Sequence, residues 1–338
     1  MTGVAPRGGP RLFLHIGRNK AGSTTLQDYF AAHADWLASL GINYALFGHA
    51  CGTVPGLPNY PSHHDIMRHC QANPEQALLI SNELIGGFTP DMAREMARDL
   101  AQFEPLVLAY VRPYRDWIRS SYAFDTRIGI NGRDIDAYQR HIAPRVSFWP
   151  SLAPWGEILG WDRVRVRSVD TRDLAGGDLI TDALTAIGLP APPLQPAFSN
   201  RMPSWMAIEA MRLVTGKPDG NGWTQATLAM AATLEILIDE ATSSCGLAGT
   251  PAVYLAQSQA RDLADLYNGD LEKLSAASGT VLTPDNAGGA PCRPFLPEAA
   301  RIPQPILRHV FNRAADADIL AAQPETAAFI RARFAAYV

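Results

Sequence analysis

Residues 12–26 read LFLHIGRNKAGSTTL, an apolar run followed by a turn that two glycines enclose and by the start of a helical pattern. The apolar run Leu12 to Ile16 is typical of a buried strand. Gly17 and Gly22 tolerate backbone angles that other residues resist, so we expect a tight loop between them. The stretch therefore predicts a strand, a tight loop and a helix, which is the building unit of an α/β fold.

One lysine lies inside this loop. Only three of the 29 basic residues are lysines, Lys20, Lys217 and Lys273, and the others are arginines. An ammonium group is a compact charge suited to one oxygen atom, whereas a guanidinium spreads its donors over a fork. Lys20 therefore indicates a site that uses a point charge.

The start of the helix adds backbone donors to that charge. The amides of Gly22, Ser23 and Thr24 would be unpaired first-turn donors at the positive end of the helix dipole. Such a helix end binds phosphate or sulfate groups. The alternative interpretation is that Ser23 or Thr24 is an ordinary N-cap.

The spacing differs from the nucleotide-triphosphate loop G-x-x-x-x-G-K-S/T. Lys20 precedes Gly22 by two residues, and Ala21 follows the lysine where that loop has the Ser or Thr that binds Mg²⁺. We therefore expect an anion site that works without a metal ion, and the missing hydroxyl weighs against a kinase-like site.

The composition narrows the class of protein. With 338 residues and 47% hydrophobic content the chain can bury a large core, and its net charge of −4 argues against a general nucleic-acid binder. It has no run of 18 apolar residues and no charged-then-apolar N-terminal segment, so we expect no membrane span and a cytoplasmic location. The four cysteines form no C-x-x-C pair, and their wide spacing suits neither zinc nor a disulfide framework.

Short apolar runs alternate with helical patterns over the first half of the chain. Strands are predicted at 12–16, 77–81, 106–111 and 163–169. A helix with Leu26, Phe30, Leu37 and Leu40 on one face is expected after the first strand, and others at about 89–103, 113–124 and 178–187. Residues 41–74, rich in Gly, Pro, Asn and His, are expected to form a long functional loop.

The second half of the chain is predicted to be helical, at about 203–215, 223–243, 254–277 and 324–336. The whole pattern predicts an α/β, three-layer fold with a central parallel sheet flanked by helices, over residues 10–190. Residues 191–338 are expected to be a helical C-terminal part packed on that core.

Suggestive side chains follow three of the predicted strands. Ligands of open parallel sheets bind at the carboxyl ends of the strands. These ends carry the loop 17–25, Asn82-Glu83 and Arg112. Arg112 and Ser120, eight residues later, could converge on one phosphate, the first as a bidentate charged donor and the second as a neutral one. Alternatively, Arg112 pairs with a structural carboxylate and Ser120 faces the core or solvent.

The loop and Arg112 together resemble the signature of the sulfotransferases that use 3′-phosphoadenosine 5′-phosphosulfate (PAPS). Lys20-Ala21-Gly22-Ser23-Thr24-Thr25 is similar to the family's 5′-phosphosulfate loop, and Arg112 with Ser120 is similar to its 3′-phosphate motif. The resemblance implies a P-loop-like fold and a PAPS site made by Asn19, Lys20, Ala21, Gly22, Ser23, Thr24, Thr25, Arg112 and Ser120. The family's late Arg-Lys-Gly loop has no counterpart here, and Arg201 or Arg293 is the candidate to replace it.

The resemblance also bears on the catalytic base. Ile80-Ser81-Asn82-Glu83 is similar to the segment that supplies the base in carbohydrate sulfotransferases, which implies Glu83. Cytosolic family members use a histidine, so His63 and His64 are alternatives. A surface or capping role is the other interpretation of Glu83. Of the remaining polar groups, Arg18 is expected to face water and His15 to be a hydrogen-bonded core histidine.

The activity implied is transfer of a sulfuryl group from PAPS to a hydroxyl of a carbohydrate or other small acceptor, with 3′-phosphoadenosine 5′-phosphate (PAP) as product. Lys20 would be catalytic, with Glu83 or His64 as base and no metal ion. Two other functions remain open from the residues: a P-loop nucleotide kinase-like phosphotransferase, and a non-catalytic nucleotide-binding protein.

Overall fold

The computed structural model describes residues 12–46, 62–190, 225–244, 257–286, 304–316 and 324–335, with the isolated positions Ile208, Glu209, Arg212, Leu255 and Asp318. The chain forms two compact units that alternate along the sequence. The first comprises Met1–Tyr114, Ser147–Asn200 and Ala264–Asp285, and the second comprises Arg115–Val146, Arg201–Leu263 and Asn286–Val338.

The first unit contains a five-stranded parallel sheet in the order β2-β3-β1-β4-β5. The strands are β1 (Leu12–His15), β2 (Ile42–Leu46), β3 (Ala77–Ser81), β4 (Leu106–Val111) and β5 (Val164–Ser168). In the centre of the sheet, Leu14 of β1 lies opposite Ile80 of β3 and Val107 of β4. All residues of β1, β3 and β4 are buried, as expected for strands covered on both faces.

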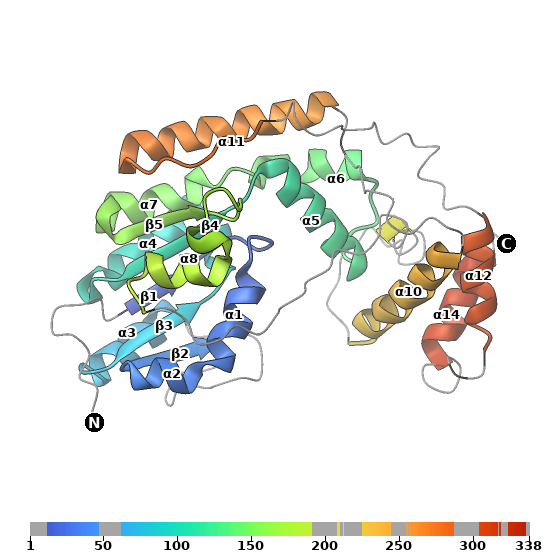
Figure 1. The fold of residues 1–338 in the computed structure, drawn as a ribbon, viewed down its shortest axis with the longest axis horizontal. Helices are drawn as coiled ribbons and strands as arrows, with labels where there is room; N and C mark the ends of the chain where they lie inside the picture. The colour runs from blue at the N-terminus through green and yellow to red at the C-terminus, as the bar shows by residue number, and fades with distance from the viewer. Residues whose placement is uncertain are drawn as a thin grey trace. The chain divides into compact units, whose positions relative to one another are not determined.

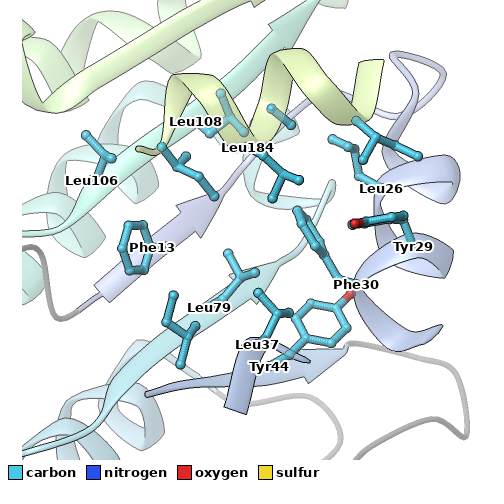
Figure 2. Packing of buried hydrophobic residues seen from close by; sticks show 14 of the residues in the cluster. Phe13, Leu26, Tyr29, Phe30, Leu37, Tyr44, Leu79, Leu106, Leu108 and Leu184 are labelled. Atoms are coloured by element: carbon cyan, nitrogen blue, oxygen red, sulfur yellow. The ribbon is translucent and has the colours of Figure 1, made fainter. Parts of the chain in front are cut away.

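Helices α1 (Ser23–Ala32), α2 (Ala34–Ser39) and α8 (Leu179–Ala186) cover one face of the sheet. Figure 2 shows the core between them, in which Phe13, Leu79 and Leu108 of the strands meet Leu26, Tyr29, Phe30 and Leu184 of the helices. Leu26 and Phe30, four residues apart on α1, both face this core, as their helical spacing predicted.

Helices α3 (His63–Ala72), α4 (Pro90–Leu100) and α7 (Trp149–Leu159) form the other layer, in which α4 packs against both α3 and α7 (Figure 1). Thr89 caps α4 by accepting a hydrogen bond from the amide of Met92, and Pro90 occupies the first turn. Alternate residues of β1, such as Leu12 and Leu14, point away from the face that holds Phe13. The α/β fold class and the three-layer arrangement are thus confirmed.

Two elements lie where the sequence predicted a loop. Residues 41–74 contain β2 and α3, while 47–61 are outside the described residues. β2 is a short strand at the edge of the sheet, so its sequence INYAL lacks the apolar run of a central strand. α3 begins at a capping box, in which Ser62 and Asp65 bond each other's backbone amides. The helix was missed because polar and histidine residues dominate its sequence.

Helix α7 was also missed, because prolines argue against helices. Pro150 lies in its first turn, where proline is tolerated, and Pro154 lies inside it. Leu152 and Trp155 are buried on this helix, so packing outweighs the propensity of the sequence.

The second unit is helical. In it α10 (Gln225–Ser244), α12 (Gln304–Arg313) and α14 (Pro324–Phe334) pack on one another through buried residues such as Leu237, Val310 and Ile330. α6 (Ile135–Ile142) belongs to this unit, and the boundaries of the units fall within α5 (Tyr114–Arg127) and α11 (Gln257–Ser278).

The helices predicted at 223–243, 254–277 and 324–336 are confirmed as α10, α11 and α14, whereas α6 and α12 were not predicted. Most of 203–215 is outside the described residues. Among the described helices, none combines the length and the apolar composition that a bilayer crossing requires.

Candidate anion-binding site

Three adjacent strand ends meet at the loop between β1 and α1. β1 lies between β3 and β4, so the residues that follow these strands share one edge of the sheet. From the β3 side, Ser23 Oγ donates a hydrogen bond to Glu83 Oε2. From the β4 side, Arg112 Nη1 donates to the carbonyl oxygen of Lys20 over 2.8 Å. The three sequence segments predicted to converge are therefore in contact.

The backbone of the loop is held in an uncommon conformation. Lys20 and Gly22 have φ angles of 63° and 84°, in the left-handed region, and the amide of Ala21 bonds the carbonyl of Arg18 over 3.3 Å. Gly22 suits this geometry, whereas Lys20 is strained there. The hydrogen bond from Arg112 to the Lys20 carbonyl therefore stabilises the loop at its strained residue.

Helix α1 begins directly at the loop. Its N-cap is Gly22, so neither Ser23 nor Thr24 has the capping role that the sequence left open. No acidic residue occupies the first turn, which leaves the positive end of the helix dipole without a carboxylate of its own helix. Ala21 and Ser23 are buried, Asn19, Lys20 and Thr25 are half-buried, and Thr24 is exposed.

Glu83 is presented to the loop by a turn that Asn82 organises. The amide of Asn82 bonds the carbonyl of His15 over 2.9 Å, which extends the pairing of β3 with β1. The side-chain oxygen of Asn82 then accepts the amide of Leu84 over 3.0 Å. This Asx turn fixes the half-buried Glu83 between two anchored residues.

The start of the loop lies against the short 3₁₀ turn Ile85–Gly87. A Cβ atom on Gly86 would lie 2.3 Å from the carbonyl oxygen of Ile16 and 2.9 Å from the carbonyl carbon of Gly17. This contact was not predicted from the sequence, although the Gly-Gly pair after β3 is a signal of close backbone approach.

Arg18 does not face water as expected. It is half-buried, and burial lowers its pKa from the usual value while Tyr114 and Asp270 act to raise it. Asp270, on α11, is buried and accepts hydrogen bonds from Tyr114, Ser147 and Lys273. Burial alone would raise the pKa of Asp270, but these hydrogen bonds hold it below its usual range. Arg18 thus interacts electrostatically with Asp270, a residue more than two hundred positions away in sequence.

His15 is a core histidine, as predicted. Its Nδ1 lies 2.7 Å from Ser81 Oγ, and burial lowers the pKa of the ring to about 4. The imidazole is therefore neutral near pH 7. The imidazole of His15 also explains why position 17 is a glycine, because a Cβ atom there would lie 2.8 Å from His15 Nε2.

The histidine alternatives for the base lie elsewhere in the same unit. His63 and His64 open α3, and His63 Nε2 is 3.1 Å from Asp99 Oδ2 near the end of α4. α4 follows β3 and returns toward the beginning of β4, so Asp99 lies toward the amino ends of the strands. Figure 1 shows α3 at that end of the sheet, away from the turn into α1. Of the proposed bases, the structure brings Glu83 to the loop.

The residues expected at the 3′-phosphate are only partly described. Arg112 lies directly after β4, and Ser120 is half-buried in the second turn of α5. Arg112 belongs to the first unit and Ser120 to the second. Arg201 and Arg293 are outside the described residues.

Comparison of the chain with protein-family models, with curated proteins and with solved structures found no match. The geometry of the loop is what bears on function. The tight turn that contains Lys20 accepts a hydrogen bond from Arg112, leads into the positive end of α1, and is contacted by the carboxylate of Glu83 through Ser23. Such an arrangement can bind an anion and place a proton acceptor beside it.

We predict that Gly86→Ala lowers the free energy of unfolding by about 1–3 kcal/mol, because the added methyl group meets rigid backbone at Ile16 and Gly17. Gly87→Ala is the matched control in the same turn, since a Cβ there meets nothing within 4 Å. It should change the free energy of unfolding by less than about 0.5 kcal/mol. Urea unfolding of both variants measures the difference, and equal losses would contradict the close approach of this turn to the loop.

Proposed function

We propose that the protein transfers a sulfuryl group from PAPS to a hydroxyl group of a carbohydrate or other small acceptor, and releases PAP. One observation carries the proposal. The loop that contains Lys20 is contacted by a carboxylate, Glu83, from one neighbouring strand end and by a guanidinium, Arg112, from the other. Sulfuryl transfer requires these three kinds of group: a cation at the leaving oxygen, a proton acceptor, and an anchor for the nucleotide.

The donor would be held at both of its anionic ends. Its 5′-phosphosulfate binds the amides and hydroxyls of residues 19–25 at the positive end of α1. Its 3′-phosphate binds Arg112, the residue of the implied 3′-phosphate motif that belongs to the first unit. A guanidinium carries five N–H donors, so Arg112 can serve the Lys20 carbonyl and a phosphate oxygen together.

The chemical step needs no covalent intermediate. The acceptor oxygen attacks the sulfur atom in line, a new S–O bond forms, and the bond from sulfur to the bridging oxygen breaks. The electron pair of that bond stays on the 5′-phosphate of PAP, and the acceptor proton passes to Glu83. Lys20 stabilises the charge that grows on the bridging oxygen, which favours the transition state over the ground state.

Glu83 is the proposed base because of its contact with Ser23. A bound phosphosulfate competes with Glu83 for the Ser23 hydroxyl. The carboxylate that loses this donor is then open to a hydrogen bond from the acceptor hydroxyl. Donor binding would therefore release the base next to the sulfuryl group. His64 is on α3, where its side chain lies beside Asp99 of α4 and not beside Ser23. Donor binding at the loop would therefore not release it.

Calorimetry with PAP tests the proposal directly. The full chain should bind PAP with micromolar affinity in the presence of a chelator, because phosphate contacts at the loop and Arg112 need no metal. Incubation with labelled PAPS and a panel of hydroxylated metabolites should then transfer the label to an acceptor. Tight binding of Mg-ATP without binding of PAP would instead identify a kinase-like phosphotransferase. PAP binding with no transfer to any acceptor would identify a nucleotide-binding protein.

The Lys20→Ala variant should lose about a hundredfold or more in turnover and little PAP affinity, as expected for a charge contact made mainly in the transition state. Lys20→Arg keeps the charge but spreads it over a fork, so we expect it to recover only part of the turnover. Steady-state kinetics of both variants with labelled PAPS provides the measurement. Wild-type turnover in Lys20→Ala would remove the role assigned to this lysine.

Glu83→Gln should also lose about a hundredfold in turnover, since general-base catalysis contributes that much or more. The amide keeps an oxygen that can accept from Ser23, so the fold and PAP binding should survive. Glu75→Gln is the matched control, because the exposed Glu75 precedes β3 where Glu83 follows it. Equal turnover in the two variants would mean that the base is another residue.

A further inference from the structure

Two histidines and an aspartate converge at the other end of the sheet. His63 and His64 occupy the first turn of α3, and Asp99 lies in the last turn of α4. One ligand atom of each side chain can be chosen so that all three lie within 4.8 Å of one another. The two imidazole rings meet edge to face with centroids 4.1 Å apart. Two helices of the same layer therefore supply three potential metal ligands to one place.

The contact between His63 and Asp99 is not a hydrogen bond. His63 Nε2 lies 3.1 Å from Asp99 Oδ2, yet within the described part of the chain this buried nitrogen has no hydrogen-bond partner. Ligand atoms around a tetrahedral zinc ion lie about 3.3 Å apart, given metal–ligand distances near 2.0–2.1 Å. The separation of these two atoms matches the edge of such a tetrahedron.

His64 can complete the set. Its side chain is exposed, so the ring can turn toward the other two ligand atoms without displacing the core. Asp65 pairs with Arg68 and with the N-cap Ser62, and the two histidines between Ser62 and Asp65 take no part in these contacts. The movement needed is that of one surface side chain.

We propose that His63, His64 and Asp99 bind a divalent transition-metal ion, with Zn²⁺ as the best fit and water as the fourth ligand. Two imidazole nitrogens and one carboxylate oxygen form a donor set that suits zinc, whereas Mg²⁺ prefers oxygen ligands only. The ion would join the first turn of α3 to the last turn of α4. It stabilises this layer and takes no part in the chemistry proposed at the loop.

The test uses the full chain after chelator treatment and dialysis. Titration with Zn²⁺ against a competing chromophoric chelator should show one bound equivalent that Mg²⁺ does not displace. Co²⁺ at the same site should give the visible absorption of four-coordinate cobalt. His64→Ala and Asp99→Asn should each weaken Zn²⁺ binding by about tenfold or more, since even loss of an outer partner costs that much. Zn²⁺ should also raise the Tm of the wild type.

His141→Ala is the control, because His141 is an exposed histidine of a different helix, α6. It should bind Zn²⁺ like the wild type. Absence of a bound equivalent, or equal affinity in His64→Ala, Asp99→Asn and His141→Ala, would overturn the proposal. A Tm that falls in Asp99→Asn, while the Tm of the wild type does not respond to Zn²⁺, would show that His63 and Asp99 form only an ion pair. Neither outcome touches the sulfotransferase proposal, because sulfuryl transfer is not measured.

Discussion

The position of β1 between β3 and β4 is the constraint on which the candidate site depends. Parallel pairing on both sides brings the carboxyl ends of three strands to one edge, where ligands of open α/β sheets bind. Each strand then needs only one suitable residue at its end. Lys20, Glu83 and Arg112 are separated by long stretches of chain, yet the register of the sheet places them around a single loop.

The loop keeps its shape because contacts from both neighbours offset its strain. A non-glycine residue in the left-handed region costs about 1–2 kcal/mol, and a hydrogen bond from a charged group contributes about 1.5–3 kcal/mol. The bond from Arg112 to the carbonyl of Lys20 is thus sufficient to balance the strained φ of that lysine. Gly86 packs against the start of the loop and restricts it further. The backbone of Lys20 is therefore held in place by contacts within the protein itself.

The sequence was sufficient for the parts of the molecule in which one local signal dominates. The buried runs that became β1, β3 and β4 are strongly apolar, and the glycine-enclosed loop has a distinct pattern, so both were predicted from the residues. β2 was missed because it is a short edge strand without a continuous apolar run, and α3 because polar and histidine residues dominate its sequence. The burial of Arg18 could not be foreseen, since the buried Asp270 that acts on its charge lies on α11, far along the chain. The same holds for His64 and Asp99, which only the packing of α3 on α4 brings together.

The contact between Ser23 and Glu83 gives the proposed mechanism an order of events. Before the donor binds, the carboxylate and the loop hydroxyl bond each other, so Glu83 is engaged by Ser23 and not by an acceptor. A phosphosulfate that takes the hydroxyl for itself leaves the carboxylate with one donor fewer, beside the sulfur atom. An acceptor hydroxyl is then the group best able to replace the lost donor, and in doing so it points its proton at Glu83. Donor binding would therefore orient the acceptor as well as free the base. When the donor is absent, Glu83 remains bonded to Ser23 and would not be available to activate a water molecule.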